Sequence, residues 1–84
     1  MKRLFQITKT SVNNNWITLW LNDNLNYKDK SSNCITVLNK APFNTYKVGD
    51  DVIIDTEAVA GHPQSAIFGE SQISKSSFYS NDNQ

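Results

Sequence analysis

The segment Trp-Ile-Thr-Leu-Trp-Leu at residues 16–21 constrains the fold more than any other feature of the chain. Side chains alternate between the two sides of a β-strand, so this segment, as a strand, separates its aliphatic residues from its tryptophans. The aliphatic set, which is the more natural core set, is Ile17, Leu19 and Leu21. Trp16 and Trp20 then share the second face, where two rings at this spacing suit stacked bases.

Other segments show the same alternation and are separated by clusters of Asn, Gly and Pro, which favour turns. The expected strands cover residues 2–10, 16–21, 34–39, 46–55 and 67–68. The fourth is expected to continue loosely through residues 57–60. Their inward residues include Phe5, Ile7, Ile35 and Val37. We therefore expect an all-β fold, either a single small antiparallel β-barrel or a strongly bent sheet, with about five strands.

One turn carries a resemblance to known folds. Tyr46, Val48, Gly49, Asp50 and Val52 form the pattern aromatic-x-Val-Gly-Asp-x-Val. This pattern resembles the turn that introduces a strand in many small β-barrels of the SH3-like or oligonucleotide-binding (OB) kind. The resemblance covers only this turn and is shared by many unrelated families, so it implies an OB-like or SH3-like architecture and no particular activity.

The length of 84 residues allows one small domain. We expect residues 1–69 to form the barrel. Residues 70–84 are rich in Ser, Gln and Asn and have few apolar anchors, among them Ile73, Phe78 and Tyr79. This composition predicts a peripheral or disordered tail, with residues 70–77 as a weak helix or an extended arm.

The chemical inventory predicts neither an enzyme nor a metal or cofactor site. Zinc requires three or four suitable ligands, and the chain has one cysteine, Cys34, and one histidine, His62. Cys34 lies inside an expected strand with no base nearby in sequence, which favours an inert thiol rather than a nucleophile. A single cysteine and the lack of a long apolar run or signal sequence indicate a soluble, cytoplasmic protein without membrane contact.

Charge is distributed unevenly along the chain although its net value is zero. Residues 1–47 contain seven basic and two acidic side chains, a balance of +5, whereas residues 48–84 contain one basic and six acidic ones, a balance of −5. Such asymmetry can create a basic surface for an anionic partner. The other interpretation is that the two regions interleave in the fold and their charges cancel.

Aromatic and basic residues carry the leading functional hypothesis. Proteins that bind single strands combine exposed aromatic rings with a positive groove. We expect a non-enzymatic protein that binds single-stranded nucleic acid, and the Asn, Lys and Ile usage suggests a phage or another mobile element with an AT-rich genome. The expected contact residues are Trp16, Trp20, Tyr27, Lys28, Lys30, Tyr46 and Lys47.

Two alternatives use the same tryptophans. In one alternative the protein is an interaction module, which means an accessory, inhibitor or assembly protein. Trp16 and Trp20 would then be binding hot spots, and the acidic residues 50–57 would contact a basic partner. A homodimer through the tryptophan face is compatible with either function. Tryptophans are also mostly buried on average. The remaining interpretation is therefore that both rings pack in the core and bind no partner.

Overall fold

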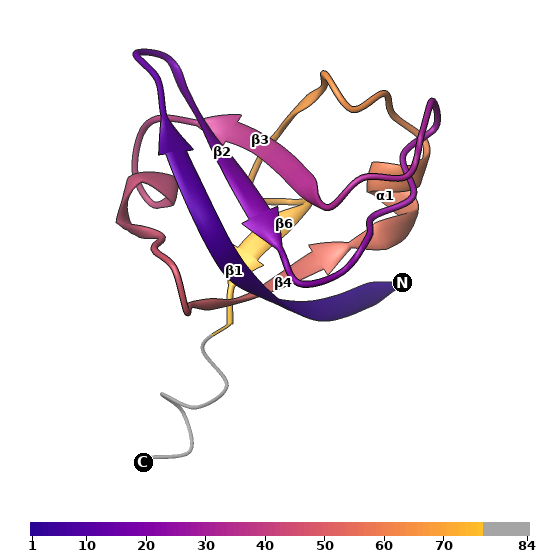
Figure 1. Ribbon diagram of the computed structural model, residues 1–84, viewed down its shortest axis with the longest axis horizontal. Coiled ribbons are helices and arrows are strands. Elements are labelled where there is room, and N and C mark those ends of the chain that lie inside the picture. The colour runs from indigo at the N-terminus through magenta and orange to yellow at the C-terminus, as the bar shows by residue number, and fades with distance from the viewer. Residues whose placement is uncertain (77–84) are drawn as a thin grey trace.

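The structure is a computed structural model that describes residues 1–76. Within these residues the chain forms one curled sheet of six strands in the order β5-β3-β2-β1-β4-β6 (Figure 1). The elements are β1 (Lys2–Val12), β2 (Trp16–Leu21), β3 (Cys34–Leu38), the 3-10 helix η1 (Phe43–Thr45), β4 (Asp51–Asp55), α1 (Thr56–Ala60), β5 (Ile67–Phe68) and β6 (Ile73–Lys75). The predicted all-β, barrel-like fold is confirmed. No helix within residues 1–76 has the length and apolar character needed to cross a membrane.

The long strand β1 joins the two halves of the sheet. Its N-terminal half pairs with β4, from Lys2 opposite Asp55 to Gln6 opposite Asp51. Its C-terminal half pairs with β2, and the register shifts between Ile7 and Lys9. Such a bulge bends a strand and increases its twist. The bend therefore curls the sheet into a half-barrel.

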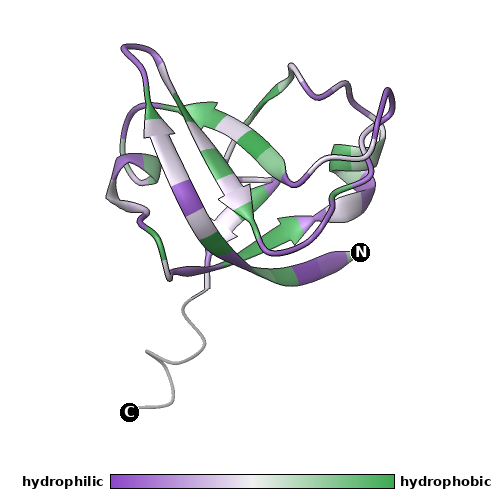
Figure 2. Ribbon diagram, viewed as in Figure 1, coloured by the Kyte–Doolittle hydropathy of each residue, from purple (hydrophilic) through white to green (hydrophobic). Residues whose placement is uncertain are grey.

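The concave side of the sheet holds the core, and the predicted alternation of residues 16–21 is confirmed. Ile17, Leu19 and Leu21 are at most 3% exposed. Figure 2 shows hydrophobic residues alternating with hydrophilic ones along the strands. The buried set comprises Phe5, Ile7, Ile17, Leu19, Leu21, Leu25, Tyr27, Ile35, Val37, Phe43, Tyr46, Val52, Ile54, Val59, Phe68 and Ile73.

The turn before β4 agrees with the sequence pattern at residues 46–52. Gly49 has a φ of +94°, which a residue with a Cβ rarely adopts. Asp50 accepts a hydrogen bond at its Oδ2 from the backbone N–H of Lys47 at 3.0 Å. The Gly-Asp pair therefore provides the left-handed backbone and the side-chain acceptor that close this turn.

Residues 56–60 depart from the expected continuation of the strand, because they form the short helix α1. Asp55 caps this helix, and its Oδ1 accepts a hydrogen bond from the backbone N–H of Ala58 at 3.3 Å. Val59 points from α1 into the core. The strand β5 pairs with β3 in a parallel direction and the other pairs are antiparallel, so the sheet is mainly antiparallel, as expected.

The strand β6 lies beyond residue 69, within the segment expected to form a peripheral tail. This strand pairs with β4, from Ile54 opposite Ile73 to Val52 opposite Lys75. Ile73 is 1% exposed, so a single side chain anchors the segment in the core. Residues 77–84 of the expected tail, including Phe78 and Tyr79, lie outside the described residues.

Candidate functional site

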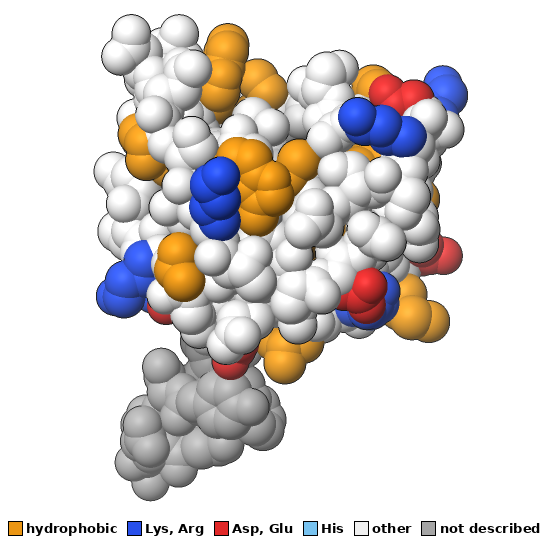
Figure 3. Space-filling model, viewed as in Figure 1, with side chains coloured by type: hydrophobic (Ala, Val, Ile, Leu, Met, Phe, Trp, Pro, Cys, Tyr) orange, Lys and Arg blue, Asp and Glu red, His pale blue; other side chains and the backbone are white. Residues whose placement is uncertain are grey.

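The tryptophans lie on the convex side of β1, β2 and β3, which we call the outer face. In an antiparallel sheet, residues directly opposite each other share a face. Trp20 lies opposite Lys9 and Cys34, and Trp16 lies opposite Leu38. The outer face comprises Lys9, Ser11, Trp16, Thr18, Trp20, Cys34, Thr36 and Leu38. Figure 3 shows hydrophobic and basic side chains next to each other near its centre.

Both tryptophan rings are accessible from solvent, although to different degrees. Trp16 is 40% exposed, whereas Trp20 is half-buried. The Nζ of Lys9 lies 4.7 Å from the ring centroid of Trp20. At this distance the ammonium is attracted by the π electrons of the indole. The expectation that Trp16 and Trp20 share one solvent-facing side of the strand agrees with this arrangement.

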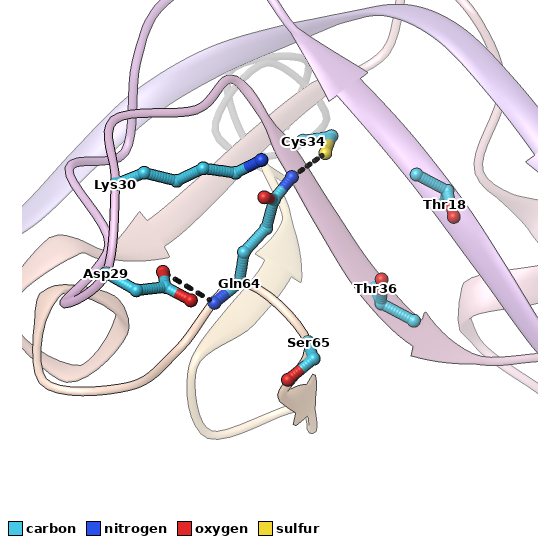
Figure 4. A pocket seen from close by; sticks show the side chains of 7 residues that line it. All are labelled: Thr18, Asp29, Lys30, Cys34, Thr36, Gln64 and Ser65. Atoms are coloured by element: carbon cyan, nitrogen blue, oxygen red, sulfur yellow. Dashed lines mark hydrogen bonds between the residues drawn. The ribbon is translucent and has the colours of Figure 1, made fainter.

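A pocket opens on the same outer face, where Thr18 of β2 and Cys34 and Thr36 of β3 line it (Figure 4). Its volume is about 480 Å³, and it is open to solvent. Its lining residues are Thr18, Asp29, Lys30, Cys34, Thr36, Gln64 and Ser65. Thr18 stands between Trp16 and Trp20 on the same side of β2, so the pocket begins at the tryptophan pair and extends across β3.

Gln64 is held in place by three hydrogen bonds. Its Nε2 donates to Ser32 Oγ at 2.9 Å and to Cys34 Sγ at 3.0 Å. Its backbone N–H donates to Asp29 Oδ1 at 3.2 Å. These bonds fix the amide at the pocket wall, and the side chain of Lys30 extends toward it from the loop between β2 and β3 (Figure 4).

The structure does not place Tyr27 and Tyr46 on this face, which corrects their prediction as contact residues. They are 5% and 8% exposed, and burial raises the pKa of both phenols. The hydroxyl of Tyr27 donates to the carbonyl of Cys34 at 2.6 Å. Tyr46 packs edge-on against Phe43 with ring centroids 5.5 Å apart. Neither ring has a face available for stacking.

The three predicted lysines are divided between two regions. Lys30 lines the pocket, and Lys28 is exposed in the same loop, where its backbone N–H donates to the carbonyl of His62. Lys47 is exposed in the turn that leads into β4, and it does not line the pocket. The structure therefore brings together Trp16, Trp20 and Lys30 but not Lys47.

Several residues of the site were missed from the sequence. Lys9 reaches the face of Trp20 because of the bulge in β1, and no sequence signal marks that bulge. Thr18 and Thr36 could have been assigned from strand alternation alone. Gln64 and Ser65 follow the Gly-His-Pro break and join the site only through the fold.

The carboxylates that form ion pairs lie off the outer face. Within residues 1–76, the carboxylates in ion pairs are Asp23, Asp50, Asp55 and Glu57, none of which lies on that face. Asp29 at the pocket accepts a hydrogen bond from Gln64. The acidic residues of β4 and α1 thus lie off the outer face, whereas Asp29 lies at its pocket.

Metal binding finds no support in the described part of the chain. No group of three or more His, Cys, Asp and Glu side chains in residues 1–76 is arranged to hold an ion. Comparison with known proteins gave no match to a family model, to a curated protein or to a solved structure. The functional argument therefore rests on the geometry of the outer face and its pocket.

Proposed function

We propose that this protein binds single-stranded nucleic acid on its outer face, without catalysing a reaction. The observation that carries the proposal is the pair Trp16 and Trp20 on one solvent-facing side of β2, with the Lys9 ammonium against Trp20. Bases stack on such rings whatever their sequence, and each stacked base contributes about 1–3 kcal/mol. Such a partner also favours a cytoplasmic location.

The charges near the tryptophans support an anionic partner. A base that stacks on an indole brings its phosphate within reach of a neighbouring lysine. Lys9 lies at Trp20, and Lys30 lines the pocket that shares Thr18 with the outer face of β2. The carboxylates of β4, which would repel a phosphate, belong to the other half of the sheet.

Fluorescence titration tests this proposal directly, because both tryptophans belong to the proposed site. Adding oligo-dT at low salt should quench the tryptophan emission as bases stack on the indoles. Trp20→Ala should weaken binding of labelled oligo-dT by about 5- to 150-fold, the equivalent of one lost stacking contact. The quench is read from fluorescence, and the affinity of the variant from anisotropy.

Leu19→Ala is the matched control, because Leu19 is the neighbouring residue on the opposite, fully buried side of β2. It should cost about 2–5 kcal/mol of stability through a core cavity, whereas Trp20→Ala should cost less. Equal unfolding of both variants, together with unchanged fluorescence on adding oligo-dT, would show that the tryptophans serve the core and would refute the proposal.

The outer face also offers a second candidate function, which is protein interaction. Leu38, opposite Trp16, is 39% exposed, and Ile67, opposite Thr36, is 47% exposed. These apolar side chains suit a protein partner or a second copy of the chain better than a phosphate backbone. This function predicts no oligonucleotide affinity at any salt concentration, whereas nucleic-acid binding weakens as salt rises.

A further inference from the structure

The pocket next to the tryptophans has a different chemistry from the rings themselves. Thr18, Thr36 and Ser65 supply hydroxyl groups, and Gln64 supplies an amide. Lys30 supplies a cation, and the one carboxylate of the lining, Asp29, accepts the backbone N–H of Gln64. Stacking needs only ring faces, whereas these groups recognise hydrogen-bonding edges and negative charge. The volume of about 480 Å³ lies in the range of pockets that enclose small ligands.

The amide of Gln64 presents its carbonyl oxygen, rather than its amino group, to a ligand. Its two N–H groups are matched by the two bonds to Ser32 Oγ and Cys34 Sγ. Within residues 1–76, no group donates a hydrogen bond to its Oε1. The fixed nitrogen therefore leaves the carbonyl oxygen free to accept a hydrogen bond from a ligand.

We infer that the pocket holds one nucleotide of the bound strand, with its phosphate at Lys30 and an amino group of its base donating to Gln64 Oε1. This inference rests on the proposed function and adds base selectivity to it. The adjacency of Trp16 and Trp20 to Thr18 allows the bases on either side of that nucleotide to stack on the rings.

The single acceptor predicts which bases fit. Cytosine and adenine carry an exocyclic NH₂ group, which donates, whereas thymine has a carbonyl oxygen in the corresponding position. A thymine carbonyl facing Gln64 Oε1 would set two acceptors against each other with no hydrogen between them, so no hydrogen bond forms. The pocket should therefore prefer cytosine and adenine over thymine.

Homopolymer binding tests this selectivity. Labelled oligo-dC, oligo-dA and oligo-dT of equal length are titrated at one salt concentration and followed by anisotropy. The native protein should bind oligo-dC and oligo-dA at least about fivefold more tightly than oligo-dT. An oligo-dC in which the N4 amino groups are dimethylated has lost the donor and should bind no more tightly than oligo-dT. This comparison needs no protein variant.

Two variants, each with a matched control, test which side chains cause the base preference and the phosphate contact. Gln64→Met keeps the length of the side chain and removes the acceptor, so the preference should disappear while oligo-dT still binds. Gln6→Met is the matched control on an exposed position outside the pocket and should keep the preference. Lys30→Gln should weaken all homopolymers and make the slope of log affinity against log salt shallower by about 0.7, whereas Lys47→Gln should not.

The outcomes separate this inference from the proposed function. Equal affinities of the native protein for all homopolymers, or a preference that survives Gln64→Met or dimethylation, would overturn the pocket assignment while nucleic-acid binding stands. Absence of binding to every oligonucleotide at low salt would overturn both.

Discussion

Among single residues, Tyr27 connects the loop between β2 and β3 to the core. Its hydroxyl donates to the carbonyl of Cys34, and its ring centroid lies 6.2 Å from that of Phe68. Because Cys34 begins β3 and lines the pocket, this contact also fixes one end of the candidate site. Tyr27 is thus a structural residue beneath the outer face rather than a stacking platform.

Tyr27→Phe should lower the free energy of unfolding by about 1 kcal/mol, because the variant loses one hydrogen bond and keeps the ring. Urea denaturation monitored by circular dichroism measures the change. Since the tryptophans are untouched, binding of oligo-dT should change by less than about twofold if the fold is retained. An unchanged midpoint would mean that the bond contributes nothing to stability.

The same phenol predicts how stability depends on pH. Burial raises the pKa of Tyr27 above its ordinary value of 10.0, so the folded state favours the neutral phenol. The stabilising contribution is therefore complete below about pH 10 and is lost as pH rises further. The free energy of unfolding should fall above that pH, and it should fall less in Tyr27→Phe. Parallel pH profiles for the two proteins would contradict this source of the effect.

At the scale of elements, β6 shows how few side chains can fix a strand. It has three residues, of which Ile73 is buried and Ser74 and Lys75 are exposed. Lys75 Nζ lies 3.3 Å from Asp50 Oδ2, an ion pair whose lysine is exposed to solvent and whose contribution is therefore small. Burial of Ile73 and pairing with β4 therefore dominate the attachment of this strand.

Ile73→Ala should lower the free energy of unfolding by about 2–5 kcal/mol, because the side chain leaves a cavity beneath β4. Ser74→Ala, at the exposed neighbouring position, should change it by less than about 0.5 kcal/mol. Thermal unfolding of both variants measures the contrast. Similar melting temperatures for the two would show that β6 is dispensable, as its composition alone suggests.

Elements with local signals were predictable from the sequence, and elements fixed by distant contacts were not. The inward set of residues 16–21 follows from alternation, and the turn at Gly49 follows from its residue types. In contrast, α1 depends on Asp55 acting as a helix cap, and β6 depends on a single isoleucine.

In the site, alternation predicted the shared face of the tryptophans. The pocket depends on Gln64, which distant contacts with Asp29 and Cys34 and the parallel pairing of β5 with β3 bring near.

At the scale of the whole molecule, the zero net charge combines a group of acidic residues at one end of the sheet with few charges on the outer face. Acidic residues gather around β4 and α1, where the N-terminal amine lies 2.6 Å from Glu57 Oε1 and Lys75 pairs with Asp50. Lys9 and Lys30 are the basic residues on the outer face and in its pocket within residues 1–76. A strand bound there meets a modest positive charge, and aromatic stacking supplies most of the affinity.

This small number of lysines predicts a shallow salt dependence. Each phosphate contact on a single strand contributes about −0.7 to the slope of log affinity against log salt, so Lys9 and Lys30 together give about −1.4. A fourfold rise in salt should then weaken oligo-dT binding about sevenfold. Lys9→Gln should reduce the slope to about −0.7, whereas Lys2→Gln, on the half of β1 that pairs with β4, should leave it unchanged. A slope more than twice as steep would place further lysines at the interface, and a slope of zero would favour apolar contacts and the protein-interaction function.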